Sequence, residues 1–276
     1  MRFTHKTPIY LLFHLILATG CLLTIVASIQ VQRNLNWESS AEEVAIKGQD
    51  VEGTELTVVE GGRSLKLKIT QVELDPQDPE QEIYLYTILY RDPVSEQWQN
   101  YCQPDRNNVA KAIPLSGYWD ETGIHIEGER ITFACTNGVL AKCVRFGYKP
   151  WKTVQGRSLR DFHQACTRMV RADYCGNGRS HTKEGTVIDI YDRARIQTRT
   201  PTSGMVFEAA WSPDGAVFIN RTRWPESLAQ LRKQCPERLK RATNDPGNPK
   251  IIHQQIREAL LFNDSFDRSA PVRLSP

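Results

Sequence analysis

The feature that most constrains this chain is an uncharged, apolar run near its N-terminus. Residues Ile9 to Ile29 (IYLLFHLILATGCLLTIVASI) contain no Asp, Glu, Lys or Arg, and Arg2 and Lys6 precede them. Positive charge ahead of an apolar run holds the N-terminus in the cytoplasm and sends the following chain across the membrane. As a helix the run spans roughly 31 Å, enough to cross a bilayer. We therefore expect residues 1–29 to be a cleaved signal peptide or an uncleaved membrane anchor.

Cysteines beyond that segment indicate covalent cross-links. An even number of cysteines in an exported chain predicts a disulfide framework, and the six candidates are Cys102, Cys135, Cys143, Cys166, Cys175 and Cys235. The sequence leaves their pairing open, with one restriction. If Leu159 to Tyr174 is helical, Cys166 and Cys175 stand about 13 Å apart, too far for a disulfide. These two cysteines should then bond to other partners.

The first half of the exported part has the pattern of a β structure. Residues 30–53 are polar and lack periodicity, which is typical of a linker. Glu55 to Glu60 and Ser64 to Glu73 flank two glycines as a hairpin would. Further runs rich in β-branched and aromatic residues predict strands at Glu82–Tyr90, Trp98–Cys102 and Ile124–Ala134.

The second half mixes helices with strands. Apolar residues recur at steps of three and four from Leu159 to Val170, which predicts an amphipathic helix with Ser158 as N-cap and Gly176 beyond its end. Further elements are expected as strands at Thr186–Tyr191, Met205–Trp211 and Ala216–Arg221, and as helices after Pro225 and over Ile251–Phe262.

These elements predict an α+β fold, mainly antiparallel β with an amphipathic helix in the cysteine-rich half. We expect one disulfide-stapled domain over residues 54–235, followed at 236–276 by a C-terminal helix and a tail that is loose beyond Asn263. Charged residues make up 24% of the chain and the net charge is only +3. The overall charge of the chain therefore gives no reason to expect a nucleic acid as its partner.

Residues suited to chemistry gather between His163 and Asp192. A hydrolase-like site would use His163 or His181 as base, with Asp173 orienting it. A zinc site would take these histidines with Cys166 and Cys175, but the spacing fits no known zinc motif and export favours disulfides. We therefore expect no metal and no cofactor. Asp173 is expected to be mainly structural, accepting hydrogen bonds from the loop after the helix.

Two further patterns concern the loop after the helix and the aromatic residues. The glycines of the Cys175–His181 run permit a tight loop, and an anion held by its amides and Arg179 is the functional alternative. We expect Tyr174 and Trp151 to be buried against the helix. Four aromatic residues offer either core packing or a ligand-stacking platform, and they are Tyr148, Trp151, Trp211 and Trp224.

Three segments in order carry a resemblance to a known family. They are FACTNGVLAKCVRFGYKPW at Phe133–Trp151, HQACTRMVRADYCGNGRSHT at His163–Thr182 and AAWSPDGAVFINRTRW at Ala209–Trp224. The chain resembles the ADYC domain family, named for the four residues that stand here at Ala172–Cys175, over about half its length. The resemblance implies a bacterial source and an exported domain, and it supports the disulfides. It brings no catalytic residue, because the family has none assigned.

Two hypotheses on function follow. The first is a non-enzymatic extracytoplasmic domain that binds an unknown protein or envelope ligand. It would be periplasmic or extracellular, and held at the inner membrane if the N-terminal segment stays uncleaved. The alternative is a hydrolase-like enzyme with its site at His163, Asp173 and His181. The enzyme requires a histidine within hydrogen-bond reach of Asp173 in an open pocket, whereas the binding domain predicts these groups buried or paired with backbone.

Overall fold

The computed structural model describes residues 28–29, 51–60, 63–242 and 256–268. Nearly all of the expected targeting segment and most of the expected linker lie outside the described residues. Ser28–Ile29, at the end of that segment, form the short strand β1. In the described ranges, no helix combines the length and the apolar character that crossing a membrane requires.

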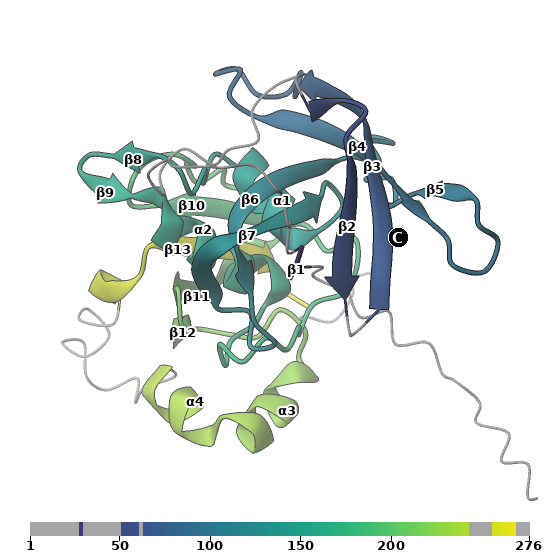
Figure 1. Ribbon diagram of the computed structural model, residues 1–276. Helices are drawn as coiled ribbons and strands as arrows, with labels where there is room; N and C mark the ends of the chain where they lie inside the picture. The colour runs from purple at the N-terminus through teal and green to yellow at the C-terminus, as the bar shows by residue number, and fades with distance from the viewer. Residues whose placement is uncertain (1–27, 30–50, 61–62, 243–255, 269–276) are drawn as a thin grey trace, which may run out of the picture.

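Among the described residues, the first half of the chain forms a seven-stranded sheet (Figure 1). Its other strands are β2 (Glu55–Glu60), β3 (Arg63–Leu74), β4 (Tyr84–Arg91), β5 (Trp98–Asn100), β6 (Ala112–Trp119) and β7 (His125–Cys135). The order is β1-β7-β6-β4-β3-β2, with β5 paired to β4 and every pair antiparallel. The end strands β1 and β2 also contact each other, so the sheet curls around an apolar core.

The sequence pattern predicted most of these strands but not β6. The expected hairpin is confirmed, because β2 pairs with β3. Strand β6 contains Pro114, and its register with β7 shifts between Ser116 and Tyr118. Gly117 at this bulge has a φ of +79°, and a Cβ there would lie 2.3 Å from Nε2 of His125. Proline and a bulge glycine interrupt the alternation that marks a strand in a sequence.

Two helices lie between this sheet and a second one. Helix α1 (Val139–Arg145), which the sequence pattern did not predict, packs on the first sheet through the side chains of Leu140 and Val144. Helix α2 (Leu159–Arg171) begins at its expected N-cap, Ser158, whose hydroxyl accepts a hydrogen bond from an amide of the first turn. It packs on the second sheet and contacts α1. The helix pair therefore joins the two sheets.

The second sheet has four antiparallel strands among the described residues. They are β10 (Ile188–Asp192), β11 (Met205–Ser212), β12 (Gly215–Ile219) and β13 (Leu261–Phe266). The order is β10-β13-β11-β12. The expected strands up to β12 are confirmed, and β11 pairs with β12 across the short turn between them. Further short elements of the described fold are the hairpin of β8 (Thr153–Val154) with β9 (Arg157–Ser158), α3 (Ser227–Gln234) and α4 (Pro236–Ala242).

Strand β13 corrects the expectation for the C-terminal part. The helix expected over Ile251–Phe262 is wrong at its end, because Leu261 begins a strand that lies between β10 and β11. Asp264 and Ser265, expected to open a loose tail, are at most 2% exposed. A short apolar run does not distinguish a helix from a buried strand, and pairing with two strands decides the outcome here. The expected α+β class with mainly antiparallel strands is confirmed for the described residues.

Candidate functional site

The ADYC segment, Ala172–Cys175, ends helix α2 and turns the chain away from it. Ala172 has a φ of +51° in the left-handed region, so the helix ends at Arg171 rather than at the expected Tyr174. The Asp173 carboxylate accepts hydrogen bonds from the backbone amides of Asn177 (3.1 Å) and Gly178 (2.8 Å). The hydrogen bonds expected between Asp173 and the loop after the helix are therefore confirmed. The loop amides that offered an anion site bind the chain's own carboxylate.

A buried ion pair connects Asp173 to helix α2. Nη1 of Arg168 lies 2.6 Å from Oδ2 of Asp173, and both side chains are at most 2% exposed. Nη1 also donates to the carbonyl of Thr122, and Nε donates to that of Pro213. Arg168 thus joins the turn after β6 to the turn between β11 and β12. Removing either member of such a pair would leave an uncompensated buried charge.

The next residue, Tyr174, belongs to a second buried ionic cluster. Its hydroxyl donates to Oε1 of Glu208 (2.9 Å) and accepts from the backbone amide of Arg223 (2.7 Å). Nε of Arg223 lies 3.0 Å from Oε2 of Glu208, and the guanidinium also donates to the carbonyls of Met169 and Val170 in the last turn of α2. Burial, together with the charge of Glu208, raises the pKa of Tyr174. The hydroxyl therefore stays protonated and acts as a structural donor.

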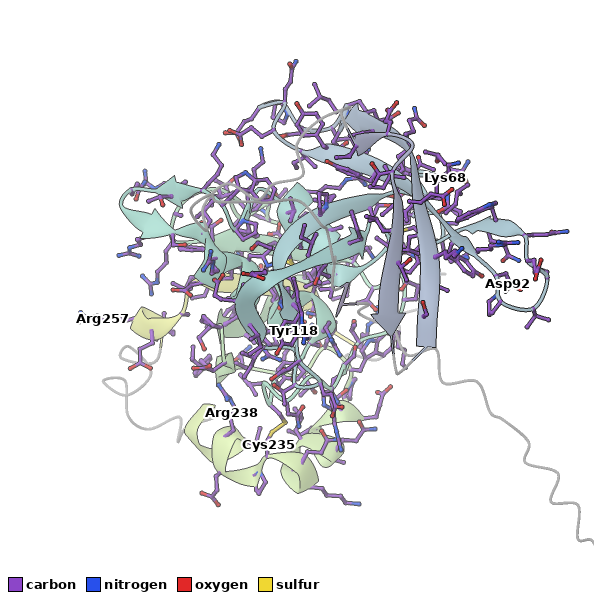
Figure 2. All side chains as sticks on the ribbon, in the orientation of Figure 1. Lys68, Asp92, Tyr118, Cys235, Arg238 and Arg257 are labelled. Atoms are coloured by element: carbon purple, nitrogen blue, oxygen red, sulfur yellow. A yellow bond between two sulfur atoms is a disulfide. The ribbon has the colours of Figure 1, made fainter. Side chains whose placement is uncertain are left out.

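The last residue of the segment, Cys175, forms a disulfide with Cys235, between α3 and α4 (Figure 2). Gly176 follows with a φ of +69°, and a Cβ there would lie 1.8 Å from the carbonyl oxygen of Asp214. The carbonyl of Tyr174 accepts a hydrogen bond from the amide of Ala216. The segment is thus pressed against the β11–β12 turn, and only glycine fits this close approach.

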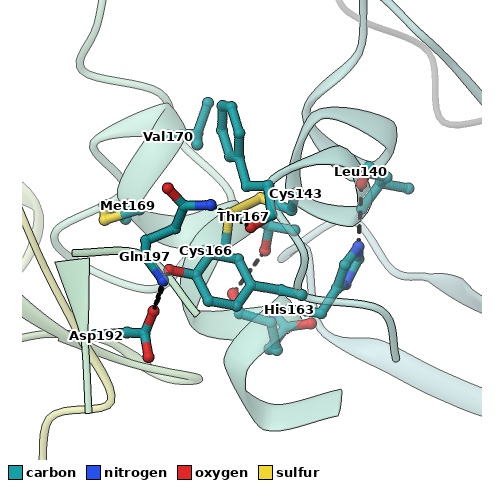
Figure 3. Close-up of a disulfide and its surroundings, with 12 residues drawn as sticks. Leu140, Cys143, His163, Cys166, Thr167, Met169, Val170, Asp192 and Gln197 are labelled. Atoms are coloured by element: carbon teal, nitrogen blue, oxygen red, sulfur yellow. Dashed lines mark hydrogen bonds between the residues drawn. A yellow bond between two sulfur atoms is a disulfide. The ribbon is translucent and has the colours of Figure 1, made fainter. Parts of the chain in front are cut away.

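All six candidate cysteines are paired. The bonds are Cys102–Cys135, Cys143–Cys166 and Cys175–Cys235. Figure 3 shows the second, which joins α1 to α2. As expected, Cys166 and Cys175 bond to different partners, so neither thiolate is free for zinc. The described residues contain no cluster of three or more groups suited to a metal. Three disulfides indicate an oxidising, extracytoplasmic environment.

His163 lies in the interior between the two helices. It is 1% exposed, and its Nε2 lies 3.0 Å from the carbonyl oxygen of Leu140 in α1 (Figure 3). Its ring centroid is 5.7 Å from that of Trp119. Burial lowers the pKa of His163 to about 4. The ring is therefore neutral at physiological pH and connects α1 to α2.

His181 is buried on the other side of the ADYC segment. It is 6% exposed, packs near the ring of Tyr174, and hydrogen-bonds through its backbone amide to the carbonyl of Arg171. Burial lowers the pKa of His181 despite an opposing effect of the Gln234 side chain. Within the described part of the chain, no hydrogen bond joins Asp173 to either histidine. The three proposed catalytic residues are thus close in sequence but do not form an acid–base pair.

A small cavity lies beside this network, between helix α2, the start of α1 and the turn after β6. Its volume is about 30 Å³, and it is partly open. Its main apolar lining is Trp119, Val139 and Leu140, and its charged lining is Asp120, Arg168 and Arg171. The sequence patterns did not identify either arginine, nor Glu208 and Arg223. Nothing in the periodicity of a helix distinguishes a buried arginine from a solvated one.

The aromatic residues do not form the alternative platform. Tyr148 and Trp211 are fully buried; Tyr148 donates to Asp192 and Trp211 donates to Asn263. Tyr174 is buried as expected, but the prediction for Trp151 is wrong because its side chain is 48% exposed. The neighbouring Lys149 forms ion pairs with carboxylates of the β3–β4 loop. Trp224 lies between two cations, Lys183 and Arg268.

Comparison with protein families gives one match, the ADYC domain, over residues 48–225. The matched range covers both buried ionic clusters and five of the six paired cysteines, but not Cys235 or β13. No curated protein and no solved structure matches the chain. Because the family match spans more than half of its residues, the chain belongs to the ADYC domain family.

Proposed function

We propose that this protein is a non-enzymatic binding domain that works outside the cytoplasm, at the bacterial envelope. Its N-terminal segment would carry it across the inner membrane and, if uncleaved, would hold it there. The three disulfides support an oxidising compartment. The domain then needs no cofactor, and its partner is a protein or another envelope component.

One observation carries the choice of binding over catalysis. Two of the three candidate acid–base groups are occupied: the Asp173 carboxylate by Arg168 and two loop amides, and the His163 ring by a helix carbonyl. The third, His181, is only 6% exposed. A general base needs an accessible lone pair within reach of a substrate proton. The cavity beside them is lined by Arg168, Arg171 and apolar side chains, which favours recognition of a ligand over catalysis.

The export part of the proposal is tested with a reporter enzyme that folds only in an oxidising compartment, fused after residue 268. We expect the fusion of the full chain to be active, and the fusion lacking residues 1–29 to be inactive. Activity of the truncated fusion would contradict the proposed export route.

The binding part is tested by co-sedimentation of the oxidised protein with isolated bacterial envelopes. We expect retention of the wild type and weaker retention of Arg171→Gln, which changes the lining of the cavity. Arg157→Gln, which removes an exposed positive charge from β9, is the matched control and should be retained like wild type. The Asp173→Asn protein should melt at a lower temperature but be retained per folded molecule. Hydrolysis of an envelope component that is lost in His181→Gln would instead support the enzyme.

A further inference from the structure

Helices α3 and α4 form an outer layer beside the ADYC segment. They lie at the edge of the molecule, beyond β11 and β12 (Figure 1), and follow the end of the family match at residue 225. Leu231 and Leu239 pack into the apolar core around α2, and Nη1 of Arg238 donates to the carbonyl of Cys175 (3.3 Å). The disulfide from Cys175 to Cys235 links this layer covalently to the segment. Apolar contacts, hydrogen bonding and a covalent bond therefore hold the layer in place.

The contact between α3 and the loop after the ADYC segment buries polar atoms that are not paired. Both ring nitrogens of His181 and Oε1 of Gln234 are buried and have no hydrogen-bond partner among the described residues. Burial lowers the pKa of His181, and the nearby side chains of Gln234 and Gln230 oppose this effect without reaching hydrogen-bond geometry. Unpaired buried polar groups cost free energy, and water would relieve that cost if α3 moved away. The closed position therefore depends on the apolar contacts and the disulfide.

The other two disulfides are less open to thiol exchange. Cys143 and Cys166 are both 0% exposed, and their bond lies in the interior between α1 and α2. Cys102 is 2% exposed, and its half-buried partner Cys135 ends β7, where pairing with β6 holds the chain with or without the bond. Cys235 is half-buried and belongs to the outer layer. Exchange requires access of a thiolate to a sulfur, so the bond of Cys235 is the one best placed to react and to change the structure.

We propose that Cys175–Cys235 is a regulatory disulfide, whose reduction lets α3 and α4 move away from the ADYC segment and uncovers His181. The reductant is the dithiol of a thiol–disulfide oxidoreductase in the same compartment. One of its thiolates attacks Sγ of Cys235, the more exposed cysteine, and Cys175 leaves as a thiolate, which the neighbouring guanidinium of Arg238 favours. The second thiol then attacks the mixed disulfide. The oxidoreductase ends as a disulfide, and its two electrons and two protons are on Cys175 and Cys235. This regulation does not depend on the binding function proposed above.

The test reduces the oxidised full-length protein with dithiothreitol, a small dithiol, and alkylates the freed thiols at increasing times. Peptide mapping should show Cys175 and Cys235 released at least about tenfold faster than the other four paired cysteines. Diethyl pyrocarbonate, which modifies accessible imidazole rings, then reports on the histidines. We expect His181 to react only after this reduction. His163, which is 1% exposed between α1 and α2, should stay unreactive and serves as the internal control.

Four results would overturn the regulatory disulfide. Release of either other disulfide first or at the same rate would show that reduction does not select this bond. Reaction of His181 in the oxidised protein would show that α3 does not cover it. If His181 stayed unreactive after selective reduction, apolar contacts alone would hold α3 in place. Reaction of His163 together with His181 would indicate general unfolding rather than movement of the outer layer.

A pair of double variants tests the same point without a reductant. Cys175→Ser with Cys235→Ser lacks the bond, so His181 should react with diethyl pyrocarbonate at once. Cys102→Ser with Cys135→Ser removes a disulfide of the first sheet instead, and His181 should remain unreactive in this matched control. Equal reactivity of His181 in both variants would contradict the proposal. If either variant does not fold, selective reduction of the wild type decides, because that experiment starts from the folded, oxidised protein.

Discussion

The first sheet closes over apolar side chains, whereas the region around the ADYC segment buries charged ones. In the first sheet Leu67, Ile69 and Ile88 are at most 1% exposed. Around the ADYC segment, Arg168 and the Glu208–Arg223 pair are equally buried. Apolar packing tolerates many residues of similar volume, but a buried ionic network requires particular groups in particular places. A motif rich in Asp, Tyr, Arg and Cys can therefore describe a structural requirement, although its composition suggests catalysis.

The sharpest test of this contrast compares one glutamate from each region. Glu208→Gln should cost about 3–5 kcal/mol of unfolding free energy, because it leaves the buried charge of Arg223 without its partner. Glu55→Gln in β2 breaks the exposed pair with Lys68 and should cost less than about 1 kcal/mol. Chemical denaturation of both variants measures the difference. Similar costs would contradict the view that charge, rather than apolar packing, sets the motif region apart.

Two tryptophans near α2 test where the core of the second sheet lies. Trp211→Ala should cost about 3–5 kcal/mol, because its ring is fully buried and its Nε1 donates to Asn263. Trp151→Ala should change stability by about 0.5 kcal/mol or less, since half of its side chain is already exposed. Thermal melts of the two variants measure these losses of stability. A large loss for Trp151→Ala would place that ring in the core after all.

The acid sensitivity of the fold should depend on His163. Its pKa is about 4 in the folded state and about 6.5 when unfolded. Between these values the unfolded chain binds the extra proton, so stability is complete above about pH 6.5 and falls as the pH drops toward 4. The loss should reach about 3 kcal/mol. Denaturation curves from pH 7 to pH 4 measure it, and His163→Gln should flatten that part of the profile. An unchanged profile would show that His163 is not buried neutral.

The sequence predicted the local parts of this architecture better than the distant ones. The hairpin of β2 and β3, the N-cap of α2 and the separate bonding of Cys166 and Cys175 depend on short-range patterns, and each is confirmed. The first two residues of β13 were predicted as the end of a helix and its last residues as a loose tail, because only its two neighbouring strands, far away in the sequence, make it a strand.

The candidate site shows the same limit. His163, Asp173 and His181 were identified by residue type, and the structure gives each a buried position. Their partners come from elsewhere, such as Leu140 for His163. The cavity needs Arg168 and Arg171 from α2 to meet the turn after β6. The spacing of residues within one segment cannot predict that α2 and this distant turn lie side by side.

The ADYC segment belongs to a scaffold closed by three disulfides, which indicate an extracytoplasmic environment. The most direct test is thiol counting and peptide mapping of the mature protein, denatured without reduction. We expect no free thiol among the six cysteines and the linkages Cys102–Cys135, Cys143–Cys166 and Cys175–Cys235. Four or more free thiols, or a bond between Cys166 and Cys175, would contradict it.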